Sequence, residues 1–193
     1  MVVNVFAKRC VQFMRKGMHV LDLGCGYGAD AMYFAKNGMK VTAIDFSSTS
    51  IDQVRERAAN LSIALRAIQH DVSNKLPFPA ATFNAVYAHL SLHYFDDETT
   101  SAIFAEIRRV LKPGGVLFVK CKSVDDPLYG KGKKIGPDMY HSEHVRRFFR
   151  KEYMEYCLRD WKILRLKRTS SVYTKYRSAF IEAIARKPVS SRA

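Results

Sequence analysis

The sequence predicts an α/β fold: a doubly wound, mainly parallel seven-stranded sheet that ends in an antiparallel C-terminal hairpin. Two observations predict the parallel part. Short apolar runs alternate with amphipathic stretches between residues 19 and 120, and the links between them are short. A third observation predicts the hairpin, because residues 161–169 and 178–186 are strand-like runs joined by a polar stretch.

The first predicted strand ends in a glycine-rich turn. Residues 20–23 form a short apolar run, as in a buried parallel strand. Gly24, Gly26 and Gly28 follow at alternate positions, and helix formers begin at Ala29. Because glycine has no side chain to hold a ligand away, this turn would place a ligand against bare backbone at a helix N-terminus.

This turn alone leaves two cofactors open. Gly24, Gly26 and Ala29 satisfy the pattern G-x-G-x-x-G/A, which is typical of sites for nicotinamide dinucleotides. S-adenosylmethionine competes for the same kind of turn, so later elements have to decide between the two.

The second strand is predicted over residues 40–45, after a helix stop at Asn37-Gly38. It ends in Asp45, which lies 21 positions after Gly24, the offset at which an acid reaches ribose hydroxyls. Helix capping is the alternative role for Asp45. Ser47 and Ser48 are the better caps for the next helix, over residues 48–60, so we favour ribose binding.

The remaining parallel elements follow in order. Strands are predicted over residues 63–69, 83–90 and 116–120, a proline-punctuated loop over 76–80, and a helix over 98–111 that stops at 112–115. Ligands in such sheets bind beyond the carboxyl ends of the strands. Polar or small residues gather at the predicted ends of four strands: Asp22, Gly24, Asp45, Asp71, His89 and Ser91.

The alternation breaks down after the fifth strand. Residues 123–147 read as a long irregular loop, and residues 123–149 are predicted to be an insertion on the substrate side of the sheet. A short helix over 150–159 leads into the closing hairpin, and the tail from residue 187 is expected to fray. No linker or repeat divides the chain, so residues 1–193 are predicted to form one domain.

Composition and cysteine usage limit the cellular setting. No apolar run approaches the roughly 20 residues that span a bilayer, so no membrane partner is expected. The basic, acid-free N-terminus faintly suggests a transit peptide, but Val2, Phe6, Cys10 and Phe13 recur at helical spacing, so a helix over the sheet edge is favoured. The four cysteines form no C-x-x-C pair, which predicts a reduced cytoplasmic protein without a metal site.

The net charge of +14 is confined to the C-terminal part of the chain. Residues 1–107 carry 10 basic and 10 acidic side chains, whereas residues 108–193 carry 22 and 8, a difference of +14. Such a region attracts nucleic acid, anionic substrates or an acidic membrane surface, or is simply a solvated surface. Tyr173 and Tyr176 lie among the basic residues, so RNA binding by this region is an alternative function.

Four motifs together resemble the class I S-adenosylmethionine-dependent methyltransferases, a Rossmann-like family, over residues 17–186. They are VLDLGCGYGAD at 20–30, AIDFS at 43–47, HDV at 70–72 and LKPGG at 111–115. The resemblance implies the roles of a methyl-donor site, in which Asp45 holds the ribose and Asp71 the adenine amine. The cofactor-binding residues predicted on this basis are Asp22, Gly24, Cys25, Gly26, Gly28, Asp45, Phe46, Asp71, Val72 and His89.

The chemistry of the donor agrees with this resemblance. S-adenosylmethionine has no phosphates but carries cationic groups, a ribose diol and an adenine, so it needs acidic acceptors more than a phosphate cradle. Asp22, Asp45 and Asp71 supply acceptors at three points, and Phe46 and Val72 can flank the adenine ring. A dinucleotide would leave Asp71 without a task.

Catalysis is expected to depend mainly on positioning, because the donor already carries an activated leaving group. Positioning contributes roughly 7–11 kcal/mol of barrier lowering. A general base contributes roughly 3–5 kcal/mol. If a base is used, His93 is the first candidate, followed by His89, His141 and His144; His93 is equally well explained as a packing residue.

The acceptor is predicted to be a small molecule, and the basic C-terminal part of the chain favours an anionic one. The alternative is an RNA methyltransferase or RNA-binding protein that uses this basic part. No N/D-P-P-Y-like stretch follows the fourth strand, and Cys121 lacks a partner Pro-Cys motif, which argues against base amines, glutamine and pyrimidine carbon as acceptors. The chain instead resembles the small-molecule branch of the family, which includes tellurite-resistance-like and ubiquinone-pathway-like methyltransferases. Candidate acceptor-binding residues are Tyr94, Tyr140, His144, Arg146 and Arg147. The guanidinium group of Arg146 or Arg147 could bind a carboxylate or phosphate through two hydrogen bonds. A catalytically silent cofactor binder is a third possibility, and the oligomeric state cannot be read from the sequence.

Overall fold

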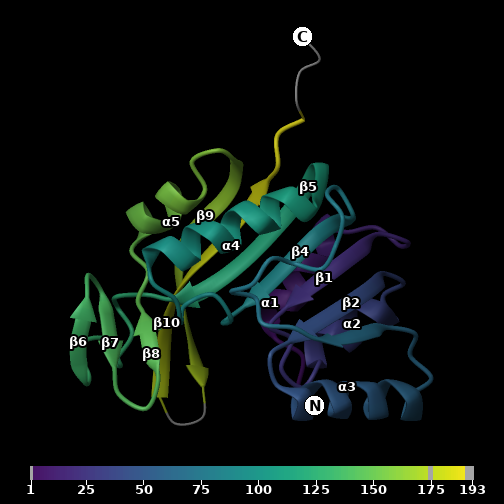
Figure 1. The fold of residues 1–193 in the computed structure, drawn as a ribbon, viewed down its shortest axis with the longest axis horizontal. Helices are drawn as coiled ribbons and strands as arrows, with labels where there is room; N and C mark the ends of the chain where they lie inside the picture. The colour runs from purple at the N-terminus through teal and green to yellow at the C-terminus, as the bar shows by residue number, and fades with distance from the viewer. Residues whose placement is uncertain (1, 174–175, 190–193) are drawn as a thin grey trace.

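The main sheet carries the predicted mixture of parallel strands and an antiparallel hairpin. The computed structural model describes residues 2–173 and 176–189, and within them this sheet has seven strands in the order β3-β2-β1-β4-β5-β10-β9 (Figure 1). Neighbouring strands from β3 to β5 pair in parallel, whereas β10 is antiparallel to both β5 and β9. The bounds are β1 (His19–Leu23), β2 (Lys40–Asp45), β3 (Arg66–Gln69), β4 (Phe83–His89), β5 (Leu111–Lys122), β9 (Lys162–Tyr173) and β10 (Tyr176–Arg186). The predicted fold class is confirmed.

Helices cover both faces of this sheet. They are α1 (Val5–Cys10), the 3-10 helix η1 (Val11–Phe13), α2 (Ala29–Lys36), α3 (Ser48–Asn60), α4 (Asp97–Val110) and α5 (Lys151–Cys157). Among the described residues, none of the helices is long and apolar enough to cross a membrane.

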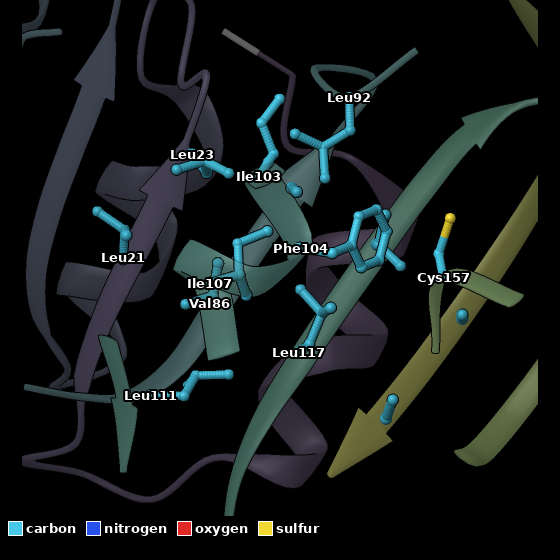
Figure 2. Close-up of a cluster of buried hydrophobic side chains, with 14 of the residues drawn as sticks. Leu21, Leu23, Val86, Leu92, Ile103, Phe104, Ile107, Leu111, Leu117 and Cys157 are labelled. Carbon is cyan, nitrogen blue, oxygen red and sulfur yellow. The ribbon is translucent and has the colours of Figure 1, made fainter. Parts of the chain in front are cut away.

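The alternation of side chains along β1 divides the core between the two faces. Leu21 and Leu23 pack with α4 and α5, and Figure 2 shows Ile103 and Phe104 of α4 on that side of the sheet. Val20 points to the opposite face and joins the cluster of α1 and α2. Because successive strand residues face opposite sides, one five-residue strand contributes to both layers.

Two helices begin with side-chain caps, and the sequence predicts the one at Ser47. The Ser47 hydroxyl accepts the backbone N–H of Ser50 at 3.2 Å, and Asp96 accepts that of Thr99 at 2.8 Å. These bonds satisfy N–H groups that the first helical turn leaves without partners. Capping of α3 by Ser47 leaves the Asp45 carboxylate available for another role.

The prediction of a long irregular segment at 123–147 is wrong. This segment contains an antiparallel sheet of β6 (Lys133–Gly136), β7 (Met139–His141) and β8 (Val145–Arg147), in the order β6-β7-β8. These strands have only three or four residues, too few to leave a clear alternation of apolar and polar side chains in the sequence. Figure 1 shows this small sheet to one side of the main sheet.

Several strand boundaries also differ from prediction. β3 starts at Arg66 rather than at residue 63, because the N–H of Ile63 bonds to Ala58 O at 2.8 Å and completes the end of α3. β5 starts at Leu111, because the chain leaves α4 directly into an extended conformation. In the closing hairpin, the paired strands continue to Tyr173 and Tyr176, into the stretch that was predicted to be a polar turn. Polar residues can extend the strands because the hydrogen bonds between them use only backbone groups. Lys175 and residues 190–193 lie outside the described residues, as do the side chains of Tyr173 and Tyr176.

Candidate active site

A cleft of about 660 Å³ opens at the carboxyl ends of the parallel strands. Its walls come from the segments that follow β1, β2, β3 and β4, and from the turn between β7 and β8. Its volume is within the range of small-molecule sites. The lining residues are Gly24, Gly26, Asp45, Phe46, Asp71, Val72, Leu90, Ser91, Tyr94, Phe95, His141, Glu143, His144 and Val145.

The glycine turn is held tightly to its neighbours. The N–H groups of Gly24 and Cys25 both donate to Ile44 O at 2.9 Å, which fastens the turn to the end of β2. Gly24 has φ +76°, and a Cβ there would collide with Ser91, so both conformation and contact require glycine. Around Gly26 the equivalent space is open, which leaves room for a ligand against the backbone.

Asp45 connects the end of β2 to this turn. Its Oδ2 accepts the N–H of Gly26 at 2.8 Å, and its Oδ1 accepts the N–H of Ser47 at 3.0 Å. The carboxylate is mostly buried yet lines the cleft. Two backbone donors therefore fix an acidic acceptor at the position that the spacing from Gly24 predicts for ribose binding.

The opposite end of the cleft combines one acid with apolar surface. Asp71 is exposed, and its Oδ1 accepts the N–H and the hydroxyl of Ser73 at 2.9 and 2.8 Å. Val72 is buried beside it, while the Phe46 ring is 74% exposed at the rim. An aromatic ring left this open in a ligand-sized cleft is suited to stacking against a flat ligand.

Asp22, Cys25 and Gly28 support the turn from behind and do not line the cleft. The carboxylate of Asp22 is buried, accepts the N–H of Ala31, and has an oxygen, Oδ2, without a partner among the described residues. Burial, together with repulsion from Asp30 and Asp45, raises the pKa of Asp22 well above its usual value. The Cys25 side chain packs into the core, and Gly28 starts α2 with φ +75° against Val54.

The structure does not bring His89 or His93 into the cleft. Burial lowers the pKa of His89 to about 4 and that of His93 to about 3. His89 lies among the rings of Phe6 and Tyr87, and the His93 ring centre is 4.4 Å from that of Tyr94. Both imidazoles are therefore neutral packing groups at neutral pH.

Two of the five candidate acceptor-binding residues, Tyr94 and His144, line the cleft. Tyr140 instead packs against Tyr129 and Phe148. Arg146 reaches the Ser142 hydroxyl at 3.5 Å from outside the lining.

The Arg147 guanidinium is buried away from the cleft and has several partners. It pairs with Asp97 at 2.9 Å, donates to Phe95 O at 3.2 Å and to Met139 Sδ at 3.0 Å, and lies over the Tyr153 ring. These bonds fasten β8 to the loop after β4.

Sequence reasoning missed several lining residues: Leu90, Phe95, Glu143 and Val145. Leu90 has φ +59°, a conformation that no sequence signal revealed and that leucine adopts at a cost. Phe95, Glu143 and Val145 lie in loops whose path depends on the small sheet. The position of Phe95 just after the fourth strand was the one available signal.

Residues 20–115 match a family model described as a methyltransferase domain. These residues belong to the methyltransferase family that this model describes. It is 35% identical over 107 residues to the sterol 4-C-methyltransferase of Caenorhabditis elegans, covering 55% of this chain and 31% of that relative. It is 34% identical over 106 residues to the 27-O-demethylrifamycin SV methyltransferase of Amycolatopsis mediterranei, covering 54% and 38%.

The fold of this methyltransferase also matches solved structures. An S-adenosylmethionine-dependent methyltransferase from Methanosarcina mazei superposes with a TM-score of 0.80 at 20% identity, covering 94% of this chain and 97% of that one. The chain spans only 31% and 38% of the length of these two curated relatives, and the similarity to them covers little more than half of this chain.

The residues present fit the family's methyl donor. Open space at Gly26, two acids at the ends of β2 and β3, and an exposed Phe46 ring lie along one cleft. The buried, partnerless Oδ2 of Asp22 behind the turn adds a hydrogen-bond acceptor near the expected position of a cationic amino-acid end.

Proposed function

We propose that this protein transfers the methyl group of S-adenosylmethionine to a nucleophile on a small molecule. The observation that carries the proposal is the division of the cleft. The ends of β1, β2 and β3 supply acids, glycine backbone and Phe46, whereas the loop after β4 and the turn after β7 supply a second wall, half of whose lining residues are apolar. One half suits the donor and the other half suits an acceptor.

In the donor half, Asp45 binds the ribose hydroxyls and Asp71 the adenine amine, while Phe46 and Val72 enclose the adenine ring. Gly24 and Gly26 admit the methionine end to the backbone, and Asp22 acts on it indirectly through the turn. When bound, S-adenosylmethionine supplies a methyl group on a sulfonium leaving group. The protein's part is then to orient the acceptor and exclude water.

Proton removal is a minor part of this proposal. His93 stays a candidate base from the sequence, but its closed surroundings favour a packing role. Unchanged turnover after His93→Ala would remove it from the mechanism. Tyr94 and His144 are the predicted acceptor contacts that also line the cleft.

Ligand binding tests the donor site directly. Calorimetry should give tighter binding of S-adenosylmethionine and S-adenosylhomocysteine than of NAD. Asp45→Ala should weaken S-adenosylhomocysteine by about 10- to 100-fold, because hydrogen bonds to a charged acceptor contribute about 1.5–3 kcal/mol. Asp52→Ala is the matched control, since its carboxylate is 70% exposed on α3 and away from the cleft. Equal binding of NAD would contradict the proposal.

The acceptor is best sought by incubating the protein and donor with fractionated metabolites and measuring S-adenosylhomocysteine release. Unspecific RNA serves as the competing candidate, and its binding should weaken steeply between 50 and 200 mM salt if the basic region tracks phosphates.

The four free cysteines support a cytoplasmic location, and we expect limited proteolysis to treat residues 1–193 as one domain.

A further inference from the structure

We propose that the part of the acceptor entering the cleft is an apolar, ring-sized group that carries an amine or a hydroxyl and no carboxylate or phosphate. This inference rests on the proposed function and names the class of its substrate. It replaces the anionic acceptor that the basic C-terminal sequence suggests.

The shape of the acceptor wall favours an apolar body. Leu90, Tyr94, Phe95 and Val145 line this half of the cleft. They come from the loop after β4 and from the start of β8, two segments joined by the bond from Arg147 N–H to His93 O at 3.0 Å. A flat apolar group can therefore be enclosed from two sides.

The charges on the cleft wall are negative. Asp45, Asp71 and Glu143 place three carboxylates along it, and no lysine or arginine lines it among residues 2–173 and 176–189. Asp45 and Asp71 lie in the donor half, at the ends of β2 and β3. Glu143, in the turn before β8, is the carboxylate that an acceptor would meet, and a carboxylate attracts amines and hydroxyls as hydrogen-bond donors.

The two nearby arginines do not reverse this balance. Arg147 is occupied by Asp97, Phe95 O and Met139. Arg146 lies outside the lining. Burial raises the pKa of Tyr94, and the positive charge of Arg146 opposes that rise. Arg146 therefore acts on the Tyr94 ring, although it does not itself line the cleft. An anionic group inside the cleft would meet carboxylates with no lysine or arginine of the described residues in contact, an arrangement that costs free energy.

A matched series of phenols tests the inference: tyramine, 4-ethylphenol and 3-(4-hydroxyphenyl)propionate, which share the ring and differ in the charge of the tail. Binding to the protein saturated with S-adenosylhomocysteine is measured by NMR titration. Tyramine should bind at least tenfold tighter than the propionate, with 4-ethylphenol between them. Glu143→Gln should remove most of the tyramine advantage, and Glu143→Lys should invert the order.

Glu152→Gln is the matched control, since this exposed acid lies in the first turn of α5 and does not line the cleft. Equal or tighter binding of the propionate would overturn the inference, and so would the absence of binding by all three phenols. In both cases intact binding of S-adenosylhomocysteine would leave the proposed function standing. Loss of S-adenosylhomocysteine binding would count against the proposed function itself.

Discussion

At the scale of single residues, burial has different consequences for Asp45 and His93. Asp45 and His93 are both mostly buried, but Asp45 lines the cleft while His93 does not. Asp45 is an acceptor held by two backbone donors, and His93 has a nitrogen, Nδ1, without a partner among the described residues. The first is prepared for a ligand, whereas the second is kept neutral by its surroundings.

The burial of His93 makes a pH-dependent prediction. Its pKa is lowered to about 3 from an ordinary 6.5, so between these pH values the unfolded chain binds a proton that the folded protein does not. The stability that this group contributes is present above pH 6.5 and is lost as the pH falls. The slope reaches about 1.4 kcal/mol per pH unit for one such group.

His93→Gln should therefore flatten the dependence of unfolding free energy on pH between 4 and 6, measured by urea denaturation. Asp22 acts in the opposite direction, because its raised pKa favours the folded state at low pH, but it is common to both proteins and cancels in the difference. His141→Gln, at an exposed position, should keep the slope of the parent protein. Parallel curves for parent and His93→Gln would contradict the assignment.

At the scale of elements, the small sheet is the part of the fold that shapes the acceptor wall. β7 and β8 hold the turn with His141, Glu143 and His144 against the cleft, and the buried Arg147 guanidinium ties β8 to the loop after β4. This arginine is thus a positioning residue: its contacts hold two sides of one cleft at a set distance.

Arg147→Met should loosen this connection without unfolding the protein. We expect a loss of about 1–3 kcal/mol in unfolding free energy, because a charged donor and its buried carbonyl partner are separated. Amide exchange should speed up in residues 133–147, while the affinity for S-adenosylhomocysteine should change less than twofold. Arg146→Met, which loses only the 3.5 Å contact with Ser142, is the control and should stay within about 0.5 kcal/mol. Equal effects of both variants would argue against the anchoring role of Arg147.

At the scale of the whole molecule, binding of the donor should stabilise the fold. The cleft joins the ends of four strands, so a ligand there contacts segments that are distant in sequence. A ligand at 100 times its Kd adds about 2.7 kcal/mol. Since 1 kcal/mol shifts Tm by about 2–4 °C in a domain of this size, S-adenosylhomocysteine should raise Tm by about 5–10 °C. NAD at the same concentration is the control, and an equal shift would indicate a dinucleotide site instead.

Local patterns were enough to predict the sheet and several residues that line the cleft at the ends of β1, β2 and β3. Strand, glycine turn and helix follow directly along the chain, and Asp45, Asp71 and the Ser47 cap each lie a short distance from a strand end. Such features depend on period, turn chemistry and offset, which are properties of neighbouring residues.

The cleft wall formed by the loop after β4 and the turn before β8 depends on contacts between segments that are distant in the sequence. Glu143 and Leu90 share a wall because β8 is fastened beside the loop after β4, and Arg147 points to Asp97 rather than to a ligand for the same reason. Strands of three residues carry no readable period, and the left-handed backbone of Leu90 leaves no mark in the sequence. Packing of the small sheet against the loop after β4 therefore decided which charges line the cleft there, and local sequence did not contain that information.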